Sequence, residues 1–361
     1  MMNTHLFLQK LEALKKRPEG YLPAIEAIQH WVLEFADTLP KQRISPVKVA
    51  MYANLSVVQV IPEFLHGVLG GIFDLNWEVH CPHCFGISDN YQHLSKAVSQ
   101  SFCKGCEKEF QADFAQWVDV TFSLNKEIDD RKFTPECTQH LSSAPKPPHL
   151  SGLELIHHPA FRTLFGDQVL SEREQMQIAS VTTLFTDITG STSMYEKLGD
   201  VRAYNIVRDH FDILFEEIEK QGGTVLKTIG DAVMASFIRN DLALNAIIDA
   251  LEQFKQYNKT RRIDEHVYIK TGIHRGSAIL VNLNERLDYF GSTINKAARI
   301  QAIASSGEIC FSEQVYQDNA FMQTLKKRAI KEITRHSVNL KGIDGAQTVY
   351  KVVTYLDKMM L

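Results

Sequence analysis

The sequence predicts an α+β protein in which a mainly helical segment and a small cysteine-bearing β module precede a larger domain of alternating strands and helices. Three observations support this prediction. Apolar residues recur at helical spacing over the first 75 residues, two Cys-x-x-Cys pairs follow, and strand and helix patterns then alternate through the second half of the chain. With 361 residues, of which 44% are hydrophobic and 23% charged, the chain is long enough for two domains with their own cores.

The net charge of −4 gives no indication of a broad surface for nucleic acid or membranes. No apolar stretch reaches the roughly 20 residues that cross a bilayer, and the N-terminal stretch lacks a signal-peptide core. Four of the six cysteines lie in Cys-x-x-Cys pairs, which fits a reducing compartment better than a disulfide framework. We therefore expect a cytoplasmic protein that makes no membrane contact.

Residues 1–75 are predicted to be mainly helical, with apolar stripes at 7–14 and 25–35. Such stripes are packing faces far more often than binding sites, so we assign them no chemistry. A helix-turn-helix that opens at Ser45 is an alternative for this segment, but the surrounding charge gives it little support.

Residues 76–125 are predicted to form a zinc-ribbon-like module. Its candidate metal ligands, in two pairs with eighteen residues between them, are Cys81, Cys84, Cys103 and Cys106. Two such pairs turn four thiolates toward one tetrahedral ion, and strand-like stretches at 77–79 and 114–122 flank them. We therefore expect one structural Zn²⁺, which has no open coordination position and holds the module together.

The alternatives for these four cysteines are unligated buried thiols or a redox pair. His80 and His83 adjoin the first pair, and we interpret both as bystanders. Cys137 and Cys310 lie outside any ligand spacing and are expected to be ordinary thiols.

Residues 126–174 are predicted to be a linker and connector. The stretch at 142–149 is rich in proline and small residues, which resist both helix and core formation. The stretch at 161–170 has a short amphipathic pattern and is expected to lead into the following domain.

Residues 175–356 alternate between strand and helix patterns. The expected elements, in chain order, are a strand at 181–187, a helix around 207–218, a hairpin of strands at 224–228 and 231–237, a helix near 241–257 and a strand near 266–274. This β-α-β-β-α-β order is the ferredoxin-like arrangement.

Two of these strands deliver an aspartate beside a glycine-bearing turn. Asp187 ends the first strand, and Gly230 and Asp231 join the strands of the hairpin. Mg²⁺ prefers oxygen ligands and leaves room for substrate phosphates, and two such ions activate an attacking oxygen and stabilise a leaving one. Either aspartate alone is equally well explained as a turn or cap residue, but the pair predicts a divalent-metal site.

Three motifs carry a resemblance to a known family. The stretches FTDITGST, KTIGDAVMASF and LDYFGSTINKAAR, in this order, resemble the class III nucleotide cyclases, and the resemblance covers residues 175–353. The N-terminal half, including FDLNWEVHCPHC, resembles an uncharacterised domain found ahead of some bacterial class III cyclases. That second resemblance implies a regulatory role.

The first resemblance implies an adenylate cyclase that converts ATP to 3′,5′-cyclic AMP and pyrophosphate by attack of O3′ on the α-phosphorus. Two Mg²⁺ or Mn²⁺ ions would be held by Asp187, Asp231 and the carbonyl of Ile188. The implied substrate contacts are Lys227 and Asp288 with adenine, Asn295 with ribose, Arg299 with the α-phosphate and Lys341 with the triphosphate. Because family members assemble the site from two subunits, a head-to-tail homodimer with two equivalent sites is also implied.

The alternatives are a cyclase of another base, GTP or a pyrimidine triphosphate, and a catalytically silent nucleotide-binding regulatory module. A lysine donor and an aspartate acceptor match the edge of adenine, and every implied metal and catalytic residue is present. A nucleic-acid-binding role for the cysteine module is disfavoured, because only Lys96 and Lys104 are basic between Cys81 and Cys106.

Overall fold

The computed structural model describes residues 2–35, 43–97, 99–130, 149–283, 285–328, 330 and 332–353. The chain divides into two units: residues 1–178 with 280–287 form unit 1, and residues 179–279 with 288–361 form unit 2. Cys137 and residues 142–148 of the predicted linker lie outside the described residues. None of the helices in the described part of the chain combines the length and the apolar character needed to span a bilayer.

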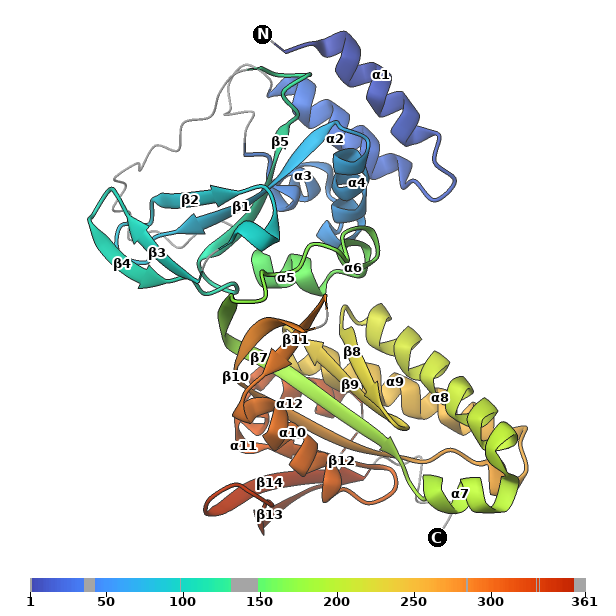
Figure 1. Cartoon of the computed structure of the whole chain (residues 1–361). Helices are drawn as coiled ribbons and strands as arrows, with labels where there is room; N and C mark the ends of the chain where they lie inside the picture. Colours follow the sequence, from blue (N-terminus) through green and yellow to red (C-terminus); the bar gives the residue numbers. More distant parts are fainter. Residues whose placement is uncertain are drawn as a thin grey trace. The chain divides into compact units, whose positions relative to one another are not determined.

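Unit 1 begins with helices, as the apolar stripes predict. These are α1 (Thr4–Lys15), α2 (Leu22–Glu34), α3 (Pro46–Ala53) and α4 (Val57–Leu69) (Figure 1). The stripes are packing faces, since Phe7 and Ile25 are fully buried. The Ser45 side chain accepts a hydrogen bond from the Lys48 amide and Pro46 follows it, which is a favourable start for α3.

A four-stranded sheet in the order β2-β1-β5-β6 shares this core. Its strands are β1 (Phe73–His80), β2 (Ile87–Tyr91), β5 (Val118–Leu124) and β6 (Leu150–Ser151). Phe64 of α4 packs on Phe73 and Phe122, with ring centroids 5.1 and 4.7 Å apart. The helical segment and the sheet of the cysteine module therefore share one core.

The predicted strand at 114–122 begins only at Val118. Residues 114–117 form a turn instead, in which the Asp113 carboxylate accepts hydrogen bonds from the amides of Ala115 and Gln116. The remaining elements of this unit are η1 (Leu94–Lys96), the hairpin β3 (Gln100–Cys103) and β4 (Lys108–Gln111), α5 (Gly152–His157) and α6 (Pro159–Leu164).

Unit 2 is built on an eight-stranded sheet in the order β13-β14-β12-β10-β7-β9-β8, with β11 paired to β10. The strands are β7 (Gln175–Ile188), β8 (Thr224–Ile229), β9 (Ala232–Phe237), β10 (Ile269–Leu283), β11 (Arg286–Phe290), β12 (Glu308–Ser312), β13 (Ile333–Asn339) and β14 (Ala346–Val353). The helices are α7 (Ser191–Leu198), α8 (Asp200–Lys220), α9 (Asn240–Lys259), α10 (Ser292–Ala302), α11 (Glu313–Tyr316) and α12 (Asn319–Lys327), with η2 (Ile263–Glu265). The predicted α+β class and β-α-β-β-α-β order are confirmed.

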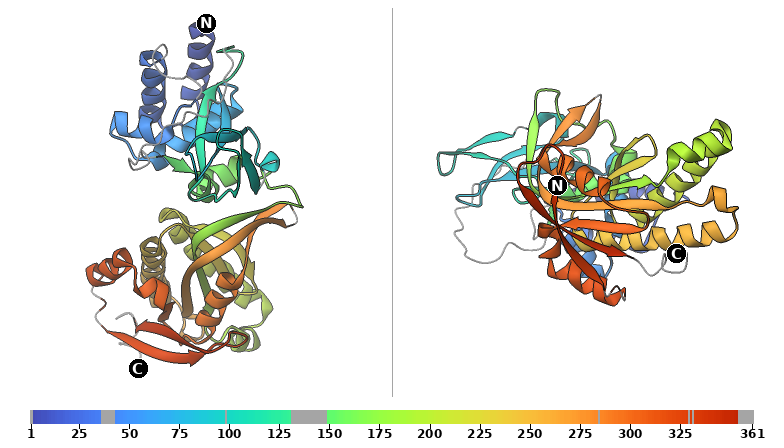
Figure 2. Two further views of the ribbon diagram at one scale, coloured as in Figure 1. Left: turned by 90° about the vertical axis from the view of Figure 1, so that its left-hand side faces the viewer. Right: turned by 90° about the horizontal axis from the view of Figure 1, so that it is seen from below.

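The two long helices α8 and α9 lie side by side against this sheet (Figures 1 and 2). Leu214 of α8 and Ile247 of α9 are fully buried in one cluster with Phe237 of β9. The sequence predicted both helices from their apolar spacing, and burial of these apolar faces is the main source of their stability.

Candidate active site and cysteine cluster

The structure brings the two predicted metal-binding aspartates together. Asp187 is the penultimate residue of β7, and Asp231 lies in the turn between β8 and β9. Because β7 pairs with β9, with Thr186 opposite Val233, the end of β7 meets this turn. The Ile188 amide donates a hydrogen bond to Oδ2 of Asp231 at 3.2 Å.

The electrostatics of this pair favour a bound cation. Burial raises the pKa of Asp231, and the negative charge of Asp187 raises it further, while hydrogen bonds from Ser191 and Ile188 act in the opposite direction. A divalent cation would relieve the repulsion between the carboxylates, and their oxygens are the hard donors that Mg²⁺ and Mn²⁺ prefer. The residues present therefore fit the implied ions.

Lys270 is a further member of this site, and none of the sequence motifs indicated it. Its Nζ lies 2.7 Å from Oδ2 of Asp187, and both side chains are about one quarter exposed, at 25% and 27%. The Thr189 amide donates to the Tyr268 carbonyl at 2.8 Å, which brings the start of β10 beside the end of β7. Lys270 lies between the buried residues Ile269 and Thr271 at the start of β10, so its partly covered ammonium is stabilised by the adjacent carboxylate of Asp187.

Lys227 and Asp288 form an ion pair across 61 residues of sequence, between β8 and β11. The contact joins Nζ of the lysine to Oδ2 of the aspartate, whose Oδ1 accepts a hydrogen bond from the Tyr289 amide at 2.8 Å. The lysine ammonium also lies 5.8 Å from the centroid of the Phe290 ring, within the range of a cation–π contact. A hydrogen-bond donor, an acceptor and an aromatic ring are thus gathered at one place.

A β-bulge between Val225 and Lys227 shifts the pairing register of β8 with β9 just before this lysine. The strand β8 ends at Ile229, and Gly230 makes the turn with a φ of +63°, a conformation that favours glycine. Asp231 therefore lies in the turn beyond the end of β8, and not on a face of the strand that carries Lys227.

Asn295 and Arg299 lie one helical turn apart on α10, and both are exposed. The helix packs so closely on β10 that a Cβ atom on Gly272 would lie 2.3 Å from the Gln301 amide nitrogen. Lys341 is exposed in the turn after β13. The structure does not bring these three side chains to the aspartate pair by any hydrogen bond or ion pair among the described residues.

In unit 1 the four predicted zinc ligands converge. Their sulfur atoms all lie within 4.8 Å of one another, at Cys81, Cys84, Cys103 and Cys106. The two turns that carry them, here called knuckles, share one backbone geometry. Phe85 and Glu107, which follow the second cysteine of each knuckle, have φ values of +61° and +55°. In each knuckle the amide of this residue donates to the carbonyl of the first cysteine at 2.8 Å.

The thiols of this cluster affect one another strongly. Burial opposes ionisation of Cys103, but hydrogen bonds from the Cys106 amide, the Cys84 thiol and the Gly105 amide lower its pKa to about 7. Burial and the three neighbouring thiols raise the pKa of Cys106 to about 12. A cation at the centre would stabilise all four thiolates, and this donor set fits one tetrahedral Zn²⁺.

Comparisons with known proteins place two families on the chain. Residues 174–355 match the adenylate and guanylate cyclase catalytic domain, and residues 8–145 match a family of unknown function (DUF5939). An adenylate cyclase from Anabaena cylindrica is 30% identical over 186 residues, which are 48% of this chain and 36% of that protein. One from Mycosarcoma maydis is 31% identical over 175 residues, covering 42% of this chain and 7% of that protein.

Among solved structures, the adenylyl cyclase CyaB from P. aeruginosa is 24% identical, with a TM-score of 0.42; the match covers 50% of this chain and 96% of that one. The two adenylate cyclases from Anabaena cylindrica and Mycosarcoma maydis are matched over 36% and 7% of their own lengths, well under two thirds in both cases. The family match extends over half of the chain and includes every residue of the aspartate pair, the Lys227–Asp288 pair and α10. This chain belongs to the family of adenylate and guanylate cyclase catalytic domains.

Proposed function

We propose that the protein is an adenylate cyclase that converts ATP to 3′,5′-cyclic AMP and pyrophosphate, and that its N-terminal half regulates this reaction. The observation that carries the choice of ATP is the contact between Lys227 and Asp288. Adenine presents a ring-nitrogen acceptor beside an amino donor, so a lysine and an aspartate at one place complement it. Guanine presents a carbonyl acceptor in place of that amino group, which Asp288 would repel.

The reaction is an in-line attack of O3′ on the α-phosphorus with departure of pyrophosphate. Asp187 and Asp231, with the Ile188 carbonyl, would hold the divalent cations; their chemistry would be to lower the pKa of the 3′-hydroxyl, whose proton leaves to solvent, and to neutralise the triphosphate. Asn295 orients the ribose, and Lys341 contacts the triphosphate. Arg299 stabilises charge on the α-phosphate, because its guanidinium is always protonated and donates several hydrogen bonds.

We further propose a homodimer in which each site combines residues of both subunits. Asn295 and Arg299 are exposed in the single chain, which suits side chains that complete a site across an interface. One subunit would supply the aspartate pair, and the other would supply Lys227, Asp288, Asn295 and Arg299. In unit 1, the cysteine cluster would hold one structural Zn²⁺. We also propose that the protein acts in the cytoplasm and does not bind nucleic acid.

Product identification tests this proposal. The full chain is given ATP, GTP, CTP and UTP separately with Mg²⁺ or Mn²⁺, and the products are identified by mass spectrometry. We expect cyclic AMP from ATP and much slower reaction of the other nucleotides. Asp231→Asn should abolish the product, while Asp212→Asn, on the exposed face of α8, is the matched control. A preference for GTP would contradict the assigned roles of Lys227 and Asp288.

A further inference from the structure

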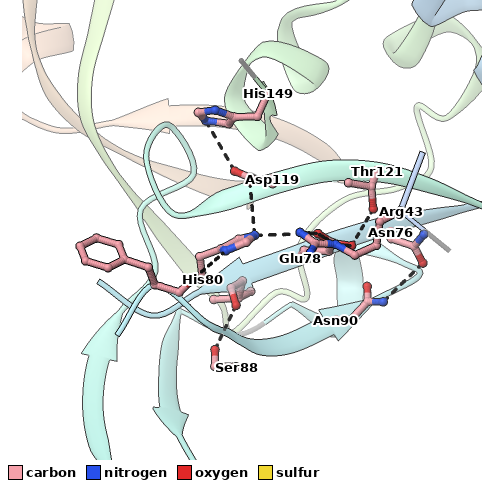
Figure 3. Close-up of polar contacts among 11 residues, drawn as sticks. Arg43, Asn76, Glu78, His80, Ser88, Asn90, Asp119, Thr121 and His149 are labelled. Atoms are coloured by element: carbon pink, nitrogen blue, oxygen red, sulfur yellow. Dashed lines mark hydrogen bonds and ion pairs between the residues drawn. The ribbon is translucent and has the colours of Figure 1, made fainter. Parts of the chain in front are cut away.

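A chain of guanidinium, carboxylate and imidazole side chains lies along the unit 1 sheet (Figure 3), and one of its members, His80, directly precedes Cys81. We call it the charge chain; its members, in spatial order, are Arg43, Glu78, His80, Asp119 and His149. The proposed cyclase reaction uses none of them. They come from distant parts of the sequence, so the fold has assembled them.

The centre of the charge chain is a carboxylate with no access to solvent. Glu78 is 0% exposed and receives hydrogen bonds from Nε of Arg43 at 2.9 and 3.0 Å and from the Thr121 hydroxyl at 2.7 Å. Burying an ionised carboxylate costs several kcal/mol unless such partners satisfy it. Burial raises the pKa of Glu78, but the His80 side chain, the charge and hydrogen bonds of Arg43 and the Thr121 hydroxyl together lower it below its ordinary value.

A second buried carboxylate stands opposite the first. Glu78 and Asp119 are cross-strand partners of β1 and β5, an arrangement that repels when both are charged. His80 lies between them, with Nε2 3.3 Å from Oδ2 of Asp119 and 3.8 Å from Oε2 of Glu78. His149 approaches the other oxygen of Asp119, with Nε2 3.5 Å from Oδ1. Nε2 of His80 is thus within ion-pair distance of both carboxylates.

The same imidazole is fixed by the cysteine cluster. His80 directly precedes Cys81, and a β-bulge between Val79 and His80 marks the start of the first knuckle. Its Nδ1 lies within hydrogen-bond distance of the Phe85 carbonyl, at 3.4 Å. Because Phe85 is the residue with positive φ that closes this knuckle, His80 contacts the knuckle on one ring nitrogen and the charge chain on the other.

The two ends of the charge chain reach segments that are paired with the sheet only briefly. Arg43 precedes Ile44, which forms an isolated bridge with Phe122. His149 precedes the two-residue strand β6. With so few ladder hydrogen bonds, these segments depend on side-chain contacts to stay on the sheet.

We propose that the charge chain positions the first knuckle for Zn²⁺. Through the same contacts, binding of Zn²⁺ to the cysteine cluster stabilises the pairing of the segments at Ile44 and Leu150 with the sheet, and loss of Zn²⁺ weakens it. This inference rests on the proposed zinc site. Loss of the ion frees the knuckle, His80 loses its contact at Phe85, and the facing carboxylates lose their shared partner. The N-terminal unit is thereby a metal-responsive module, and Glu78 is a positioning residue for a site that it does not contact.

The first test measures how fast the full chain, loaded with one equivalent of Zn²⁺, gives up the metal to a chromophoric chelator. Glu78→Gln removes the central charge, and we expect zinc release to be about tenfold faster, as for other changes in the surroundings of metal ligands. Asp74→Asn is the matched control, because Asp74 lies on the same face of β1 but accepts its hydrogen bond from Asn125 instead. Equal release from Glu78→Gln and the wild type would overturn the proposal.

The second test uses the unaltered chain, so it holds even where Glu78→Gln fails to fold. Amide hydrogen exchange is compared with and without a chelator at Ile44, whose amide donates to the Phe122 carbonyl at 2.7 Å, and at Leu150. We expect exchange at both to accelerate about tenfold when Zn²⁺ is removed, with α2 unchanged. Faster exchange confined to the knuckles would contradict the claim that loss of Zn²⁺ affects the segments at Ile44 and Leu150. A chain that binds no Zn²⁺ would overturn the metal site and leave the cyclase proposal untouched.

Discussion

The ammonium of Lys227 contacts the carboxylate of Asp288 at a position where the aspartate is only 7% exposed. A nucleotide base that binds here must separate the two groups and replace each of their contacts. The free energy of base binding is therefore the difference between the contacts that Lys227 and Asp288 make with the base and the contact that they make with each other. A base that satisfies only one of the two residues is strongly disfavoured.

Asp288→Ala should selectively impair the use of ATP. The variant removes the acceptor for the adenine amino group and leaves Lys227 without its partner, so kcat/KM for ATP should fall about 10–100-fold. The value for GTP should fall less. Steady-state kinetics with both nucleotides provide the measurement, with Asp212→Ala as control. An unchanged ratio of the two kcat/KM values would show that this pair does not read the base.

Lys270→Gln should tighten the apparent binding of divalent metal. The ammonium at 2.7 Å competes with a cation for Oδ2 of Asp187, so its removal lowers the Mn²⁺ concentration for half-maximal activity severalfold. A titration of activity against Mn²⁺ measures this. Lys270→Arg retains the charge and should resemble the wild type. A weaker metal response in Lys270→Gln than in Lys270→Arg would contradict this role.

His210 should make unit 2 sensitive to acid. Burial lowers its pKa to about 4 from an ordinary value of 6.5, although the Val207 backbone and the charge of Asp187 act in the opposite direction. The unfolded chain therefore takes up a proton below pH 6.5 and the folded chain only below about pH 4, so stability is lost as the pH falls through this window. Because protonation of His210 is linked to unfolding, its contribution to the free energy of unfolding falls by about 3 kcal/mol by pH 4.

Equilibrium denaturation between pH 7 and pH 4 measures this effect. His210→Leu should make the dependence of the free energy of unfolding on pH shallower, while His157 and His274, whose pKa values burial also lowers to about 4, supply the remaining dependence. His336→Leu, at an exposed position of unit 2, should leave the dependence unchanged. Parallel curves for His210→Leu and the wild type would contradict the assignment.

Some of these features follow from local sequence patterns, and others do not. The order of elements around Asp187 and Asp231 was predictable because strand and helix periodicities are local, and two short motifs mark the turns. The contact of Lys227 with Asp288 was expected only through the family resemblance, because no local pattern joins residues 61 positions apart.

The charge chain was not predicted at all. Glu78 and His80 were interpreted as parts of a strand flank and a bystander, because their partners Arg43, Asp119 and His149 come from other segments. The pairing of β1 with β5, the pairing of β5 with β6 and the bridge at Ile44 bring these groups together. Long-range strand pairing depends on the whole core, and single-sequence periodicity does not report it.

Subunit complementation tests most directly the claim that ATP is cyclised at a site shared between two subunits. Asp231→Asn and Arg299→Ala are each purified, expected to be inactive, then mixed and allowed to exchange subunits before cyclic AMP is measured. Half of the dimers then contain both variants and have one intact site out of two, so activity should return to about one quarter of the wild-type value. A mixture as inactive as its components would contradict the shared site.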